Sequence, residues 1–134
     1  MANLKEIEGI GPVYAGKLED IGIKTTEALL EKGAAPGGRK EIADKCDISP
    51  KLILRWVNMA DLFRIKGIGE EYSDLLEASG VDTVPELAQR NPENLYEKMA
   101  EVNEEKNLVR HLPGKQMVAD WVAEAKTLPR VLTY

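Results

Sequence analysis

Two short glycine turns carry the residue types and spacing that best suit ligand binding. Gly9-Ile10-Gly11, the first glycine turn, and Gly67-Ile68-Gly69, the second glycine turn, each lead directly into a segment with helical spacing. Glycine lets the backbone approach a ligand closely, and the first amides of a helix have no intrahelical acceptor. The helix dipole adds partial positive charge at the same place. Each turn is therefore a candidate cradle for a phosphate, although a tight interhelical turn needs the same glycines when nothing binds.

The segments that follow the two turns differ in charge. Pro12-Val13-Tyr14 follows the first turn, whereas Glu70-Glu71 follows the second. Carboxylates at a helix N-terminus satisfy the dipole and repel an arriving phosphate, so we expect the second turn to lack this role. The candidate phosphate site is thus the first turn, with basic side chains that are equally compatible with a solvated surface. Its predicted members are Gly9, Ile10, Gly11, Lys17, Lys51 and Arg55.

No set of residues has the pattern of a catalytic or metal site. His111 is the only histidine and Cys46 the only cysteine, so neither a nucleophile-histidine pair with a patterned acid nor a thiolate cluster can be assembled from the sequence. No acidic pair stands apart from the ordinary Glu and Asp of helix surfaces. We predict a protein that is not an enzyme and holds no metal or cofactor, with Cys46 as a buried structural thiol.

An internal repeat organises the chain. The segment Ile7-Glu8-Gly9-Ile10-Gly11 returns as Ile65-Lys66-Gly67-Ile68-Gly69, an offset of 65 − 7 = 58. Trp56 corresponds to Trp121 at the larger offset of 121 − 56 = 65, so the second copy has gained 65 − 58 = 7 residues, which we place in the polar stretch Asn103–Asn107. The repeat predicts one unit over residues 1–61, the first half, and a second over residues 62–134, the second half.

Local signals in both copies are helical. Asn3 and Glu6 have capping-box spacing, and Gly22 has the place of a helix stop. Thr25 or Thr26 opens the next helix, and the run Gly33–Gly38 is predicted to be a loop. No window alternates like a half-buried strand. We predict an all-α fold of two tandem repeats, with about five short helices each. Both Trp residues, at helical spacing among aliphatic neighbours, should be core residues.

Charge and hydropathy limit the classes of partner that the chain can have. The chain has 134 residues, with 18 basic and 23 acidic side chains and a net charge of −5. Residues 1–62 hold 9 basic and 10 acidic side chains, a net of −1, and residues 63–134 hold 9 and 13, a net of −4. No segment approaches the roughly 20 apolar residues of a membrane span, and residues 1–6 lack the apolar core of a secretory signal. We expect a cytoplasmic protein with no membrane partner and no small-molecule substrate.

The repeated pattern resembles a known motif. Ile-x-Gly-Ile-Gly followed by a helix with Tyr, Leu and a closing Gly, over residues 7–23 and 65–81, resembles the helix-hairpin-helix motif. Residues 4–60 resemble the N-terminal domain of archaeal RadA-type recombinases. The joint over residues 56–69 and the tail over residues 125–130 resemble an uncharacterised bacterial family catalogued as a domain of unknown function (DUF4332-like). The joint Asn58–Lys66 lacks Gly and Pro, so we expect one compact body.

The helix-hairpin-helix resemblance implies DNA-backbone binding without base readout, and a possible monovalent cation on the carbonyls of a turn. Two functions therefore stay open. One is weak, sequence-independent DNA binding, or a DNA-associated adaptor, through the first glycine turn. The other is a protein-interaction scaffold that binds no nucleic acid, which suits the acidic charge. Carboxylates around the first turn in three dimensions would favour the second function.

Overall fold

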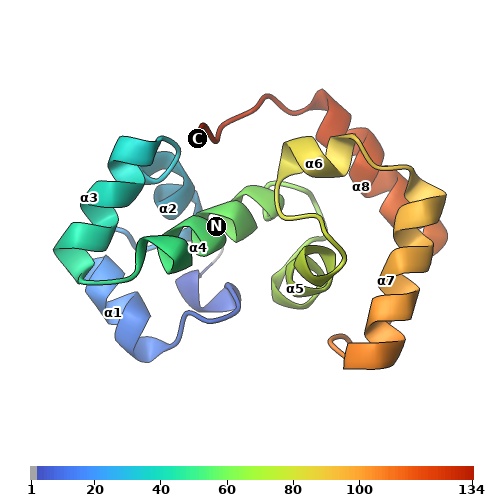
Figure 1. Cartoon of the computed structure of the whole chain (residues 1–134), viewed down its shortest axis with the longest axis horizontal. Helices are drawn as coiled ribbons and strands as arrows, with labels where there is room; N and C mark the ends of the chain where they lie inside the picture. Colours follow the sequence, from blue (N-terminus) through green and yellow to red (C-terminus); the bar gives the residue numbers. More distant parts are fainter. Residues whose placement is uncertain (1–2) are drawn as a thin grey trace.

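Cap residues and first-turn prolines divide the chain into short helices. In the computed structural model, which describes residues 3–134, one 3-10 helix and eight α-helices follow one another (Figure 1). Their bounds are η1 (Leu4–Glu6), α1 (Pro12–Asp20), α2 (Thr26–Lys32), α3 (Pro36–Cys46), α4 (Pro50–Leu62), α5 (Glu70–Ala78), α6 (Val84–Ala88), α7 (Pro92–Lys106) and α8 (Lys115–Thr127). Over the described range the only β-type pairing is an isolated bridge between Asn3 and Thr25. The predicted all-α fold class is confirmed.

The predicted cap residues act as caps. Asn3 and Glu6 form a reciprocal capping box at η1, which is a 3-10 helix rather than an α-helix. The Thr25 hydroxyl oxygen accepts a hydrogen bond of 3.1 Å from the backbone amide three residues on and so begins α2. Gly22 has a φ of 88°, the left-handed conformation expected of a residue that follows a helix end. Local sequence therefore determines these helix boundaries.

The prediction of a loop over Gly33–Gly38 is wrong for its second half. α3 begins at Pro36, so Gly37 and Gly38 lie in its first turn. A Cβ atom on Gly38 would lie 2.0 Å from the carbonyl oxygen of Lys32, the last residue of α2. Glycine at this position therefore allows the backbones of α2 and α3 to approach closely. From composition alone, the same glycine indicates a loop.

The prediction of one insertion within Asn103–Asn107 is correct only in part, because the length difference between the two halves is spread over three places. α7 has 15 residues where α3 has 11, and the connection over residues 107–114 is longer than its counterpart over 47–49. α6, with 5 residues, is shorter than α2, with 7. Asp47 and Asn107 end their helices alike in the left-handed conformation, with φ of 53° and 51°.

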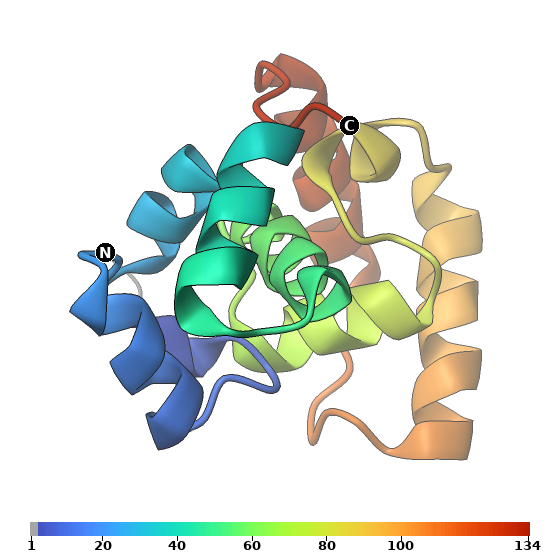
Figure 2. The same cartoon turned by 60° about the vertical axis from the view of Figure 1, so that its left-hand side comes forward.

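Two hydrophobic cores lie on either side of the junction at the end of α4. The first core gathers buried residues from Leu4 to Ala60, with Leu132, and the second gathers buried residues from Leu62 to Ala125. Trp56 and Trp121 are 0% and 2% exposed, which confirms their predicted place in the core. Each packs against a tyrosine, with ring centroids 5.0 Å and 5.2 Å apart. Figures 1 and 2 show α1 and α7 at opposite ends of the molecule, with α4 between them.

The end of α4 ties the two halves through a buried carboxylate. Asp61 is 0% exposed, and its Oδ1 accepts a hydrogen bond of 2.9 Å from Nη1 of Arg64. Its Oδ2 accepts a bond of 2.8 Å from the backbone amide of Val84, at the start of α6. Arg64 also donates to the carbonyl oxygen of Pro129 at 2.7 Å. Asp61 of α4 thus binds α6 directly and binds the segment after α8 through Arg64.

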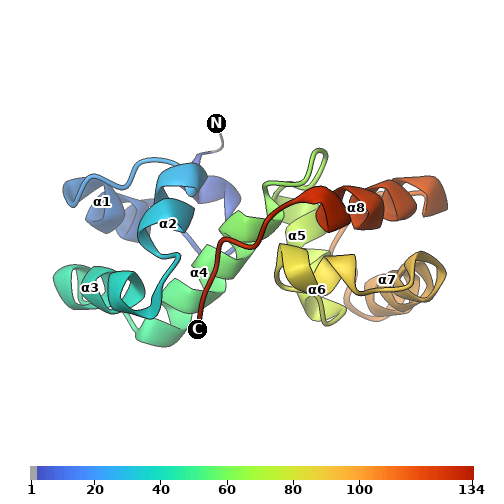
Figure 3. The same cartoon turned by 90° about the horizontal axis from the view of Figure 1, so that it is seen from above.

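The C-terminal tail, residues 128–134, returns from α8 to the first half (Figures 1 and 3). Leu132 is 2% exposed within the first core. The backbone amide of Thr133 donates to the carbonyl oxygen of Ala34 at 2.8 Å, and Nη2 of Arg39 donates to the carbonyl oxygen of Thr133 at 2.7 Å. The predicted compact body is confirmed, and this tail is one of the segments that hold it together.

Adjacent glycines in α3 test the close approach of α2 and α3. Gly38→Ala should destabilise the protein by about 1–3 kcal/mol, because the added methyl group must displace the backbone of Lys32. Gly37→Ala is the matched control, since a Cβ there meets nothing within 4 Å, and it should stabilise the protein by up to about 1 kcal/mol. Thermal unfolding of both variants measures the difference, and equal melting temperatures would contradict the packing argument.

Candidate functional site

The first glycine turn uses part of its own backbone internally. Gly9 has a φ of 97°, and the amide of Ile10 donates to the carbonyl oxygen of Ile7 at 3.1 Å. The Ile10 side chain is 4% exposed, within the first core. Ile10 therefore closes the turn and offers no amide to a ligand. What is left for an anion is the start of α1, where Gly11 provides no side-chain cap and the first turn holds no acidic residue.

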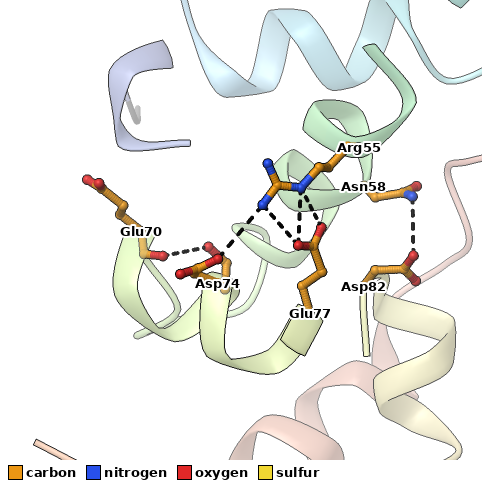
Figure 4. A network of polar contacts seen from close by, with 7 residues as sticks. Arg55, Asn58, Glu70, Asp74, Glu77 and Asp82 are labelled. Atoms are coloured by element: carbon orange, nitrogen blue, oxygen red, sulfur yellow. Dashed lines mark hydrogen bonds and ion pairs between the residues drawn. The ribbon is translucent and has the colours of Figure 1, made fainter. Parts of the chain in front are cut away.

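Arg55 lies against the first glycine turn but is bound by the second half. Its Nη1 would be 3.3 Å from a Cβ atom on Gly9. Its Nε and Nη2 each donate to the Glu77 carboxylate at 3.0 Å, and Nη2 lies 3.8 Å from Oδ1 of Asp74 (Figure 4). The hydrogen bond with Glu77 raises the pKa of Arg55, followed by weaker attraction from Asp74. The positive charge predicted for a phosphate is therefore already paired.

Carboxylates from both halves meet beside the first glycine turn. Burial raises the pKa of Glu70, and repulsion from Glu8 and then Glu6 raises it further. Burial likewise raises the pKa of Asp74, with Glu8 the next contribution. We name this group the acidic seam, which consists of Glu6 and Glu8 beside the turn and Glu70, Asp74 and Glu77 on α5. The seam gives the predicted phosphate cradle a negative surrounding.

The two predicted lysines do not join Arg55 as a cluster. Lys17 lies in the last turn of α1, whereas the first glycine turn lies at the opposite end of that helix. Its carbonyl oxygen accepts a long contact of 3.5 Å from Sγ of Cys46, whose pKa is raised by burial. The prediction that Cys46 is a buried free thiol is confirmed. Lys51 is exposed in the first turn of α4, one turn before Arg55.

The second glycine turn has the same backbone geometry but is followed by a different first helical turn. Gly67 has a φ of 91°, and the amide of Ile68 donates to the carbonyl oxygen of Ile65 at 3.2 Å. Gly69 caps α5, whose first turn holds Glu70 and Glu71. The turn thus presents carboxylates where the first turn presents Pro12 and an exposed Val13, as their sequences indicated.

Sequence reasoning missed a polar junction between α4, α6 and the tail. Nδ2 of Asn58 donates to Oδ2 of Asp82 at 3.4 Å, and the Tyr134 hydroxyl donates to Oδ1 of Asn58 at 3.2 Å. Burial raises the pKa of Asp82 to about 6, helped by a hydrogen bond and repulsion from Glu86. A cavity of about 390 Å³ opens beside these groups. No spacing rule joins Asn58 to residues 24 and 76 positions later, so no sequence signal marked the site.

The raised pKa of Asp82 predicts a pH-dependent stability. Because its pKa is about 6 in the folded chain against 3.8 for a free side chain, the folded state binds the proton more tightly. The contribution of this proton to the stability of the folded state is complete below about pH 4 and is lost as the pH rises through 6. Asp82→Asn should therefore raise the stability at pH 7 by about 1 kcal/mol, allowing for solvent screening, and flatten the profile between pH 4 and 7. Urea denaturation measures this, with Glu93→Gln as the exposed control; parallel profiles for wild type and Asp82→Asn would contradict the assignment.

Neither a metal site nor a membrane span is present in the described part of the chain. Within residues 3–134, no group of three His, Cys, Asp or Glu side chains has an arrangement that could hold a metal ion. Among the same residues, no helix combines the length and apolar character needed to cross a membrane.

Comparison with known proteins places the chain in a family. The family model described as "Domain of unknown function (DUF4332)" matches residues 8–128. No curated protein and no solved structure matches the chain significantly. The matched segment covers both glycine turns, the acidic seam except Glu6, and all of α1–α8 up to the first residue of the tail. The chain therefore belongs to the DUF4332 family.

Proposed function

We propose that this chain is a non-enzymatic helical binding module that docks a basic surface of a partner protein along the acidic seam. The observation that carries the proposal is that Arg55 lies against Gly9 and binds Glu77, which brings α5 to the first glycine turn, where Glu6 and Glu8 act on Glu70 and Asp74. One guanidinium, that of Arg55, lies among these five carboxylates and is hydrogen-bonded to Glu77. The seam therefore keeps an excess of negative charge that a basic partner can neutralise.

The same charges weigh against the phosphate backbone of DNA. Salt-dependent affinity for DNA requires several phosphates to be neutralised by Lys or Arg. Of the three predicted basic residues, Arg55 is paired, Lys17 lies at the far end of α1, and Lys51 is a single exposed lysine. A phosphate that approached Gly11 would meet Glu8 on the same loop. The full negative charge of Glu8 opposes the partial positive charge of one helix N-terminus.

Association steered by opposite charge fits the rest of the molecule. The second half contributes a net charge of −4 and the first half −1, and the seam lies where they meet. A surface of this kind increases the rate of encounter with a positively charged protein and discriminates against an acidic one. Helix α5 holds three of the five carboxylates of the seam, so these three are presented with little loss of backbone entropy on binding.

DNA binding is retained as a second candidate because one observation favours it. The N-terminus of α1 has neither a side-chain cap nor an acidic residue in its first turn, and Val13 beside it is 72% exposed. These amides are accessible to an anion in a way that those of α5, with Glu70 and Glu71, are not. In this alternative, a duplex is held weakly and without base readout at Gly11, with Lys17 and Lys51 as the remaining basic contacts.

Two titrations of the full chain decide between the candidates. At about 50 mM salt, where charge contacts are least screened, a lysine-rich peptide should shift backbone NMR signals of η1 and α5, and a DNA duplex should shift none. Glu8→Lys with Glu70→Lys should weaken peptide binding on the order of tenfold, because two favourable charge contacts become repulsive. Glu97→Lys with Glu101→Lys, two exposed residues of α7, changes the net charge equally and should weaken it far less.

The DNA candidate has its own signature in a gel shift. If duplex binding occurs and is weakened by Gly11→Ala or Lys17→Glu, and strengthened by Glu70→Lys with Glu71→Lys, the first glycine turn holds DNA and the protein proposal is wrong. Gly11→Ala is a clean variant because a Cβ there meets nothing within 4 Å, so the fold is retained while approach to the amides is blocked. Equal effects of the seam and α7 variants on peptide binding would likewise reject docking at the seam.

A further inference from the structure

A cavity lies at the far end of α5 from the first glycine turn, where α4, α6 and the tail meet. It has a volume of about 390 Å³ and an apolar part formed by Leu54 of α4 and Leu132 of the tail. Cavities of this size accommodate a small ligand or one large side chain with its flanking backbone. The cavity is therefore large enough for specific recognition, and the tail that forms one side is held in place by Arg39 and Ala34.

One wall of the cavity carries two carboxylates that lack a basic partner. Asp82 and Glu86 line the cavity together, and Glu86 also accepts a hydrogen bond of 3.4 Å from the backbone amide of Asp82. Within residues 3–134, no Lys or Arg forms an ion pair with either carboxylate. The side-chain partners of Asp82 are the neutral amide of Asn58, which donates at 3.4 Å, and the carboxyl group of Glu86, so neither partner is a cation. Two neighbouring carboxylates beside an apolar floor lack a compensating cation.

We propose that this cavity binds the cationic side chain of a lysine or arginine from the partner, with its charged end at Asp82 and Glu86 and its aliphatic stem against Leu54 and Leu132. The inference rests on the proposed function, since it assigns an anchor pocket to the same partner. Glu77 connects the two sites, because it binds Arg55 in the seam and its charge also acts on Asp82 (Figure 4). Glu77 therefore lies close enough to both sites for one basic segment to contact the seam and the cavity.

The chemistry of the lining favours a cation on a hydrocarbon stem over other ligands. Methylene groups of lysine and arginine pack on apolar surface while their charged ends stay in a polar setting. The paired carboxylates match the several N–H donors of an ammonium or guanidinium group. Arg130 also lines the cavity, is exposed, and carries a charge of the same sign as the proposed ligand. Replacing Arg130 by a neutral residue should therefore strengthen binding of a cationic side chain. The same replacement would weaken binding of a ligand that itself carries a carboxylate.

The test uses a short peptide with blocked ends and a single central lysine, titrated into the isotope-labelled full chain at about pH 7.5, above the pKa of about 6 of Asp82. The side-chain amide of Asn58 and the backbone amides of Thr83 and Gln89 should shift and saturate. The same peptide with norleucine in place of lysine has nearly the same stem and no charge, and it should leave these signals unchanged. Equal shifts with both peptides would overturn the proposal.

Matched variants locate the binding. Asp82→Asn with Glu86→Gln should weaken binding of the lysine peptide on the order of tenfold, because both charge contacts are lost. Glu97→Gln with Glu101→Gln makes the same change in charge on α7 and should leave the affinity unchanged. Arg130→Gln should increase the affinity several-fold. Unaltered affinity in the Asp82 and Glu86 variant, or a loss of affinity in Arg130→Gln, would overturn the pocket.

The two proposals fail separately. If Glu8→Lys with Glu70→Lys leaves binding of the long lysine-rich peptide intact, the seam is refuted, and saturation of the cavity by the single-lysine peptide still decides the pocket. If the long peptide binds the seam and the short one does not saturate the cavity, only the pocket is refuted. Retained folding of each variant is checked by its far-ultraviolet circular dichroism and thermal transition.

Discussion

The structure depends on the burial of the last two turns of α4 on every side. All residues from Trp56 to Leu62 are buried, so no face of the last two turns is left to solvent. A helix covered all round must be enclosed by other elements, and α2, α3 and α5 pack directly against it. The first core forms on the earlier part of this helix and the second begins at its last residue. The two copies of the repeat are therefore joined by a shared core element and not by a linker.

Polar residues on a buried helix create the ties between the halves. Asn58 and Asp61 are buried, with 7% and 0% of their surface exposed, and a buried polar group without a partner costs more than the net gain of an ordinary hydrogen bond. Asp61 is satisfied by Arg64 and by the first amide of α6, and Asn58 by Asp82 and Tyr134. The position of α6 and the return of the tail follow from these needs. The cavity beside Asp82 is a consequence of the same arrangement, since the tail spans the gap between α4 and α6 and does not fill it.

Charge, more than backbone geometry, distinguishes the possible partners. Both glycine turns have one glycine with positive φ and one amide closed on the residue three positions earlier. They differ in the side chains that surround them, and the first turn acquires most of its negative surroundings from α5 of the other half. A site that is suitable for an anion within one copy of the repeat is therefore less suitable in the assembled molecule. This is why the acidic seam, and not the first glycine turn, carries the proposed function.

Sequence by itself determined several of the helix boundaries, the repeat and the burial of the two Trp residues. Those features depend on contacts within about four residues, or on a pattern that recurs whole, as in the Thr25 cap and the matching Trp56 and Trp121. Only the tertiary structure decided that Arg55 pairs with Glu77, that Gly38 lies inside a helix and that the tail returns to Ala34. Each of these involves backbone approach or charge pairing between different elements. Local propensity holds no information on such contacts, because their energies depend on distances that exist only after the helices have packed around α4.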